Sequence, residues 1–135
     1  AIYNASGSEL LFWAQGLATT ISLSIGELDA GTLYSDSYTA DRTAIEGKAY
    51  YLKIVRDEAV GTYGTLYCYI YSNAARTILV DTLSVTLHTS KKDFRYIYAF
   101  QGYGAAADTA TASGYTESLT LTGAPTTFIP QVIII

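Results

Sequence analysis

The acidic residues are the natural place to look for chemistry in this 135-residue chain, because glycoside hydrolysis requires two opposed carboxylates. The candidates are Glu27 with Asp29, Asp57 with Glu58, and Glu117. All except Glu117 lie in or next to predicted turns, where acids usually interact with solvent. We therefore expect no catalytic pair and predict that the protein is not an enzyme.

The single histidine and the single cysteine offer no alternative catalytic group. His88 ends a predicted strand on its polar face, and no Gly-x-Ser-x-Gly elbow accompanies it. We expect an exposed side chain that takes no part in catalysis. Cys68 lies mid-strand on the apolar face and cannot form an internal disulfide, so we expect a buried, inert thiol.

Metal binding finds little support, because a calcium site needs several converging oxygen ligands. The aspartates that such a site would draw on are scattered along the chain: Asp29, Asp36, Asp57 and Asp108. We predict no metal and no cofactor.

Charge and hydropathy argue against two classes of partner. The net charge is −4, whereas nucleic acid binding requires a basic surface. The one dense basic cluster, formed by Lys91, Lys92 and Arg95, includes Asp93 and is interpreted as a solvated loop. The apolar run at residues 132–135 is far too short to cross a membrane, so no membrane insertion is expected.

The acidic, histidine and cysteine side chains must be positioned by strands, because apolar and polar residues alternate with a period of two through the chain. It predicts strands at residues 19–25, 32–38, 49–56, 65–72, 77–80, 82–88, 94–101 and 115–121. Residues 10–13 fit a strand or a helical turn, and their length favours a strand. The many short strands predict an all-β antiparallel sandwich or barrel, with one domain over residues 1–122 and an extension or edge strand at 123–135.

Tyrosine is the unusual feature of the composition, with 13 residues against four phenylalanines. Tyr67, Tyr69 and Tyr71 project from one side of a predicted strand, and Tyr51 is expected beside them on the same hairpin. Such rings could stack on the apolar faces of sugars. The interpretation that we favour is that they cover a second sheet or form an interface between subunits, because interfaces are also rich in tyrosine.

The C-terminal residues 128–135 are apolar and β-branched, but Pro130 confines them to an edge or a bulge. They could add a strand to the sheet of a neighbouring subunit, or form the last edge strand of their own sandwich. The residues of this candidate assembly strand are Phe128, Ile129, Val132, Ile133, Ile134 and Ile135.

The central stretch resembles a known family. It reads YYLKIVRDEAVGTYGTLYCYIYSNAARTILVDTLSVTLHTSKKDFRYIYAFQGY and is followed by SGYTESLTL. This run is similar to the concanavalin A-like (laminin-G-like) jelly-roll domains of phage and environmental viral proteins, and the resemblance covers roughly residues 26–121. Two features depart from the family: the first 25 residues supply few strands, and the tail after residue 121 is an addition.

The resemblance implies a jelly-roll fold and a place on a virion or in another extracellular setting. Only 15% of the residues are charged, which also suits surfaces that are covered in an assembly. The expected partners are copies of the chain or other assembly subunits. The expected function is therefore that of a non-enzymatic structural or decoration protein, with a carbohydrate-binding module as the alternative and a glycan hydrolase as a third possibility.

Overall fold

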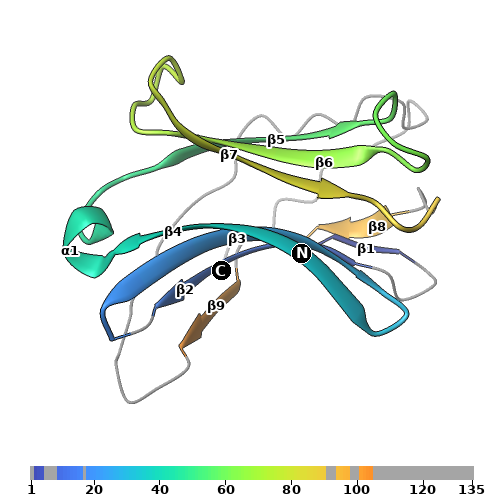
Figure 1. Ribbon diagram of the computed structural model, residues 1–135, viewed down its shortest axis with the longest axis horizontal. Coiled ribbons are helices and arrows are strands. Elements are labelled where there is room, and N and C mark those ends of the chain that lie inside the picture. The colour runs from blue at the N-terminus through green and yellow to red at the C-terminus, as the bar shows by residue number, and fades with distance from the viewer. Residues whose placement is uncertain (1, 5–8, 17, 91–93, 98–100, 105–135) are drawn as a thin grey trace.

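The computed structural model describes residues 2–4, 9–16, 18–90, 94–97 and 101–104. Within these ranges the protein is all-β, and its strands form two sheets that lie one above the other (Figure 1). The larger sheet contains six described strands and the smaller contains three. The prediction of an all-β fold with two sheets is confirmed.

The six-stranded sheet has the order β4-β3-β2-β1-β8, and β9 pairs with the second half of β2. Its strands are β1 (Ile2–Asn4), β2 (Glu9–Gly16), β3 (Thr20–Asp29), β4 (Thr32–Asp41), β8 (Phe94–Ile97) and β9 (Gln101–Gly104). The pairing is antiparallel except between β9 and β2, which are parallel. β8 lies within the strand predicted at 94–101, and β9 extends three residues beyond the predicted end of that strand.

The β3–β4 hairpin is longer than the alternation indicated. Asp29 pairs with Thr32, so Ala30 and Gly31 alone form the turn, with φ values of 48° and 86°. Positive φ at both central residues is the signature of a type I′ hairpin turn. The predicted end of this strand at residue 25 was wrong, because β3 continues through the buried Gly26 as far as Asp29.

The three-stranded sheet is a meander of β5 (Tyr51–Asp57), β6 (Thr65–Tyr71) and β7 (Leu79–Thr86), paired antiparallel throughout. Alternation placed β5 and β6 within two residues of their observed bounds. The two strands predicted at residues 77–80 and 82–88 are in fact one strand, β7, with an irregularity in its pairing with β6 near Tyr71.

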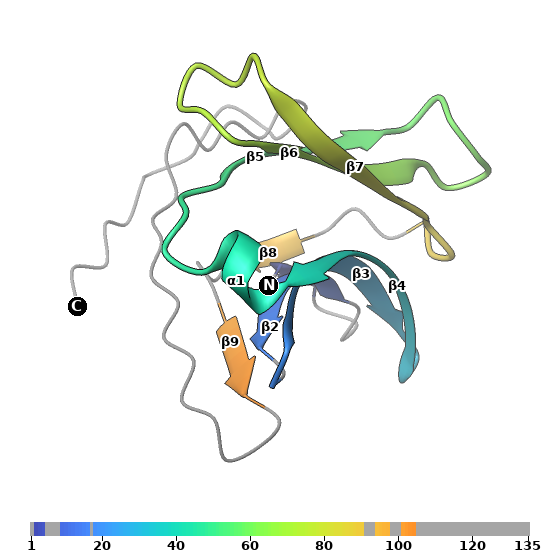
Figure 2. The ribbon, with the colours of Figure 1, turned by 60° about the vertical axis from the view of Figure 1, so that its left-hand side comes forward.

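A short helix interrupts the strands where none was predicted. Helix α1 (Arg42–Ile45) follows β4 at the point where the chain leaves the six-stranded sheet for the three-stranded one (Figure 2). Ile45 is buried, and the backbone N–H of Arg42 donates to the carbonyl oxygen of Thr19. Four residues are too few to produce a helical period, so the pattern of side chains could not indicate this turn.

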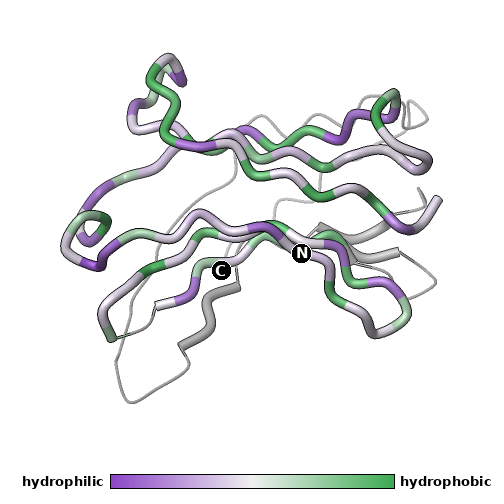
Figure 3. The backbone as a smooth tube through the Cα atoms, viewed as in Figure 1, coloured by the Kyte–Doolittle hydropathy of each residue, from purple (hydrophilic) through white to green (hydrophobic). Residues whose placement is uncertain are grey.

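The core lies between the two sheets and draws side chains from both. Apolar and polar residues alternate along the strands (Figure 3), which gives each sheet one apolar inner face. Its buried members are Leu10, Ile25, Leu66, Cys68, Ile70, Leu83, Val85 and Leu87.

Several predictions fall on residues outside the described part of the chain. These are the strand at 115–121, the candidate assembly strand at 128–135, the domain boundary at 122, and the residues Lys91, Lys92, Asp108 and Glu117.

Candidate functional site

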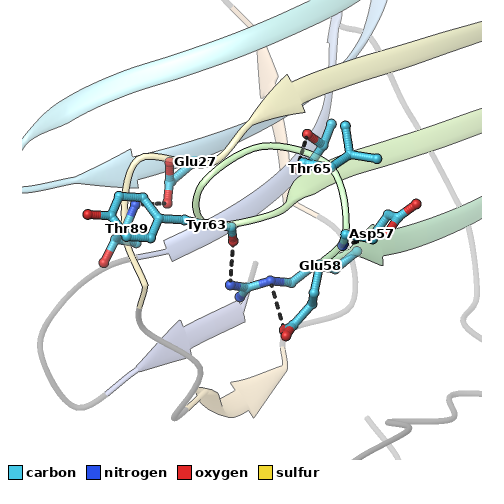
Figure 4. A network of polar contacts seen from close by, with 9 residues as sticks. Glu27, Asp57, Glu58, Tyr63, Thr65 and Thr89 are labelled. Carbon is cyan, nitrogen blue, oxygen red and sulfur yellow. Dashed lines mark hydrogen bonds and ion pairs between the residues drawn. The ribbon is translucent and has the colours of Figure 1, made fainter.

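Glu27, proposed above as a turn carboxylate, is a buried structural group. It lies within β3, is 0% exposed, and points into the space between the sheets. Its carboxylate accepts the backbone N–H of His88 at 2.6 Å. It also accepts the backbone N–H of Thr89 at 3.2 Å (Figure 4). Because buried charged groups require such partners, Glu27 fastens the segment after β7 to the opposite sheet.

Asp36 makes a second connection between the sheets. One carboxylate oxygen accepts the N–H of Ser84 on β7 at 2.9 Å, and the other accepts the N–H of Ser37 at 2.8 Å. Ser84 lies on β7, which ends the three-stranded sheet among the described strands, so its outward N–H groups face no other strand there. Asp36 and Glu27 therefore join the β3–β4 side of the larger sheet to β7 of the smaller one.

The other paired carboxylates also have structural partners. Asp57 accepts the N–H of Ala59 at 2.9 Å, which stabilises the turn after β5. Glu58 lies 3.5 Å from Arg56, whose guanidinium also donates to the carbonyl of Tyr63 (Figure 4). The structure thus uses these acids to shape one turn.

His88 is exposed, as predicted, but it is not isolated. Its ring stacks on Tyr34 with the centroids 3.5 Å apart and the planes at 11°, and its Nδ1 lies 3.4 Å from the Glu27 carboxylate. The aromatic contact and the carboxylate orient the imidazole, so the interpretation of this side chain as a spectator was incomplete.

Cys68 is fully buried and free, in agreement with its predicted place on the inner face of β6. Burial raises the pKa of its thiol to about 12, because the apolar core disfavours the charged thiolate. A thiol of this kind is a poor nucleophile near neutral pH.

Within the described ranges, no group of three or more His, Cys, Asp or Glu side chains could hold a metal ion. The described part of the chain also contains no helix long and apolar enough to span a membrane.

The structure brings together all four tyrosines of the predicted face. Tyr67, Tyr69 and Tyr71 point outward from β6, because Leu66, Cys68 and Ile70 between them are buried in the core. Register places Tyr51 of β5 beside Tyr71 and Lys53 beside Tyr69. We name Tyr51, Lys53, Tyr67, Tyr69 and Tyr71 the tyrosine face.

The rings of this face are ordered against one another. Tyr67 and Tyr69 have centroids 6.2 Å apart and planes only 18° from parallel. The ammonium of Lys53 lies 6.0 Å from the centroid of the Tyr69 ring, within range of a cation–π interaction. Thr82 and Ser84 of β7 pair with Tyr69 and Tyr67 and add hydroxyl groups along one side.

A hollow of about 450 Å³ continues the tyrosine face at the end of the sheet where Tyr51 lies. This end hollow is lined by Lys48, Ala49, Tyr50, Tyr51, Ser72, Asn73, Ala74 and Val80. Burial, together with the nearby phenol of Tyr38 and a hydrogen bond to it, raises the pKa of Tyr50 above its usual value. The phenol therefore stays neutral.

Three consecutive aliphatic residues next to the hollow were missed by sequence reasoning. Ile78, Leu79 and Val80 are 59%, 52% and 37% exposed, and Leu79 pairs with Tyr71 across β6 and β7. The Asn73 side chain holds the turn before them, because its amide oxygen accepts the N–H groups of Thr77 and Ile78. A run of consecutive apolar residues was the available signal, since a half-buried strand would alternate.

Comparison with known proteins adds no relative to this picture. No protein-family model matches the chain, and neither a curated protein nor a solved structure shows significant similarity to it.

Proposed function

We propose that the chain is a non-enzymatic structural or decoration protein of a virion or other extracellular assembly. The observation that carries this proposal is the outer surface at one end of the three-stranded sheet. There Tyr51, Tyr71 and Leu79 form a row across the strands, and Ile78 and Val80 flank it on the surface. Contiguous exposed apolar and aromatic side chains are typical of surfaces that bind other macromolecules.

The edge of β5 supports the same function. Among the described strands, β5 ends the three-stranded sheet on the side away from β7, and Ile54 within it is 47% exposed although its neighbour Cys68 is buried. An edge strand with an exposed apolar residue can accept a strand from another chain. Assembly through strand edges and the tyrosine face would cover both surfaces.

The absence of enzymatic activity is part of the proposal. Glu27, Asp36 and Asp57 each accept backbone N–H groups that shape the fold, and the Cys68 thiol is protonated. These side chains are therefore engaged in stabilising the protein.

The fold is proposed to be a jelly roll of the concanavalin A-like type. The support is the sequence resemblance together with two facing sheets between which the chain crosses twice, after β4 and again after β7. Folds of this type occur both in virion surface proteins and in carbohydrate-binding proteins. The fold alone therefore does not distinguish between these two functions.

Leu79→Ser tests the assembly proposal, and Val60→Ser is its matched control because Val60 is 43% exposed on the loop between β5 and β6. We expect an oligomer of the wild-type chain by size-exclusion chromatography with light scattering. Leu79→Ser should weaken it at least about tenfold, because its buried area is lost, and Val60→Ser should not. A wild-type chain that is monomeric at every concentration and binds no other subunit contradicts the proposal.

A carbohydrate-binding module is the second candidate function. The observation that favours it is the ordered pair of Tyr67 and Tyr69 with Lys53 beside them, since aromatic faces bind the apolar sides of sugars. A monomeric chain that binds glycans on an array, and loses that binding in Tyr69→Ala, would select this function over the first.

A further inference from the structure

The tyrosine face carries positive charge on a protein that is acidic overall. The net charge of the chain is −4, yet Lys53 stands within the aromatic rows and Lys48 lines the end hollow. No described carboxylate forms an ion pair with either lysine. Glu46, the acid nearest to Lys48 in sequence, lies 3.8 Å from Arg42. The two ammonium groups thus remain available to an anionic ligand.

The spacing of the aromatic side chains suits an extended chain of rings. Residues two apart on a strand are about 6.7 Å apart, so the side chains of Tyr51 and Lys53 on β5 follow one another along one line. Tyr71 and Tyr69 repeat this arrangement on β6, directly beside them. A ligand along the two strands would meet an aromatic ring at Tyr51 and Tyr71, and a ring with a cation at Tyr69 and Lys53.

The end hollow is an open depression at the end of the same surface. Its volume of about 450 Å³ is within the range of small-ligand sites. Tyr50 and Tyr51 supply aromatic walls, while Lys48 and Ser72 supply a cation and a hydroxyl. The Asn73 side chain, which lines the hollow, also holds the adjoining turn through hydrogen bonds to Thr77 and Ile78.

We propose that the tyrosine face and the end hollow bind an acidic saccharide. Its rings would lie against Tyr69 and Tyr51, and its anionic groups would meet Lys53 and Lys48. This inference rests on the carbohydrate-binding candidate and names its ligand class. A uronate carboxylate and a sulfate ester present the same charge to the lysines, and the experiment separates these two sources.

The experiment measures binding of the full chain to oligogalacturonate, to sulfated dextran oligosaccharide and to neutral dextran oligosaccharide by titration calorimetry. We expect binding to at least one of the acidic ligands, at least tenfold tighter than to the neutral one. Lys53→Gln should weaken that binding about tenfold, and Lys53→Arg should retain it because the charge is kept. Tyr69→Ala should abolish binding, with circular dichroism confirming that the variant is folded.

Three results would overturn the inference: no binding to either acidic saccharide, equal affinity for the neutral one, or an unchanged affinity in Lys53→Gln. Equal binding of a poly-glutamate peptide would show that the face selects anionic chains of any kind, and would also overturn it.

Light scattering on the same variants separates this inference from the assembly proposal. If Lys53→Gln loses saccharide binding and keeps the wild-type mass, the face is a ligand site and assembly uses other surfaces. If Lys53→Gln instead dissociates an oligomer, the face is a subunit contact and the saccharide inference fails. If the chain is a monomer and binds an acidic saccharide, the assembly proposal is rejected and the saccharide inference stands.

Discussion

The outer faces of the two sheets differ in whether their polar side chains find partners within the protein. On the six-stranded sheet, the hydroxyls of Ser22 and Thr39 lie 2.8 Å apart across β3 and β4, as do those of Ser24 and Ser37. We call these four residues the hydroxyl face. On the three-stranded sheet, the tyrosine face presents half-buried rings and a lysine without a described carboxylate partner.

This difference separates a stabilising surface from a binding surface. Hydroxyl pairs across strands contribute to the sheet and leave few groups for a ligand. Large aromatic side chains beside a cation have the opposite property, because their rings and charge can contact another molecule without loss to the core. We therefore expect substitutions on the hydroxyl face to lower the free energy of unfolding, and substitutions on the tyrosine face to weaken ligand binding.

The largest expected effect concerns the buried acid that joins the layers carrying the two faces. Glu27→Ala leaves the N–H groups of His88 and Thr89 without their acceptor. We expect a loss of about 3–5 kcal/mol in the free energy of unfolding, measured with urea. Asp57→Ala, which removes one turn contact, is the control and should cost about 1 kcal/mol. A Glu27→Ala protein as stable as the wild type would contradict this assignment.

The next effect lies directly beneath the tyrosine face, at Cys68. Its pKa is raised from 9.0 to about 12 in the folded state, so the folded thiol keeps a proton that the unfolded thiol loses. Its contribution is therefore complete below pH 9 and is lost as the pH rises toward 12. The expected slope in unfolding free energy is about 1.4 kcal/mol per pH unit.

Cys68→Ala provides the control for this measurement, because tyrosines also titrate in alkaline solution. The difference between the wild-type and Cys68→Ala stability curves isolates the thiol. Parallel curves from pH 9 to 11 would show that the thiol ionises as readily in the folded chain as in the unfolded one.

The direct test of the comparison pairs a substitution in β3, the strand that carries Ser22 and Ser24 of the hydroxyl face, with one on the tyrosine face. A Cβ atom at Gly26 would lie 2.8 Å from the backbone oxygen of Tyr34 and 3.2 Å from the Trp13 ring. Gly26→Ala should therefore cost about 2 kcal/mol, whereas Tyr69→Ala should cost about 1 kcal/mol or less and remove ligand binding. The comparison fails if Tyr69→Ala is the more destabilised of the two in urea.

The smallest effect is expected at the turn that closes the β3–β4 hairpin. Ala30 has φ 48°, a conformation that asparagine adopts more readily than alanine. Ala30→Asn should raise the free energy of unfolding by about 0.5 kcal/mol, which is a gain of a few degrees in Tm. Ala30→Val should lower it, since β-branched residues tolerate positive φ poorly. The opposite order would contradict the type I′ turn.

Alternation was sufficient to predict the parts of the fold in which one side chain faces the core and the next faces out. It separated Leu66, Cys68 and Ile70 from the tyrosines of β6, and it placed Tyr51 beside them. These predictions succeeded because the pleat of a strand imposes the period whatever the partner sheet is.

The sequence-based predictions were wrong where one residue type can occupy two different structural environments. Gly26 provides space beneath Trp13 within a strand, although glycine more often marks a turn. Glu27 is buried although acids are usually exposed, because backbone N–H groups 61 and 62 residues away supply its partners. Ile78, Leu79 and Val80 were interpreted as a strand of their own, although apolar residues can also remain on the surface.

The order of residues by itself determined that this chain forms strands with one apolar face, and which side of β6 carries the rings. Only the tertiary structure decided that Glu27 and Asp36 fasten one sheet to the other, and that Lys53 and the end hollow meet the tyrosine face. The reason is the separation along the sequence over which each effect acts. The pleat of a strand relates adjacent residues, whereas these contacts join strands whose proximity depends on how the whole chain crosses between the two sheets.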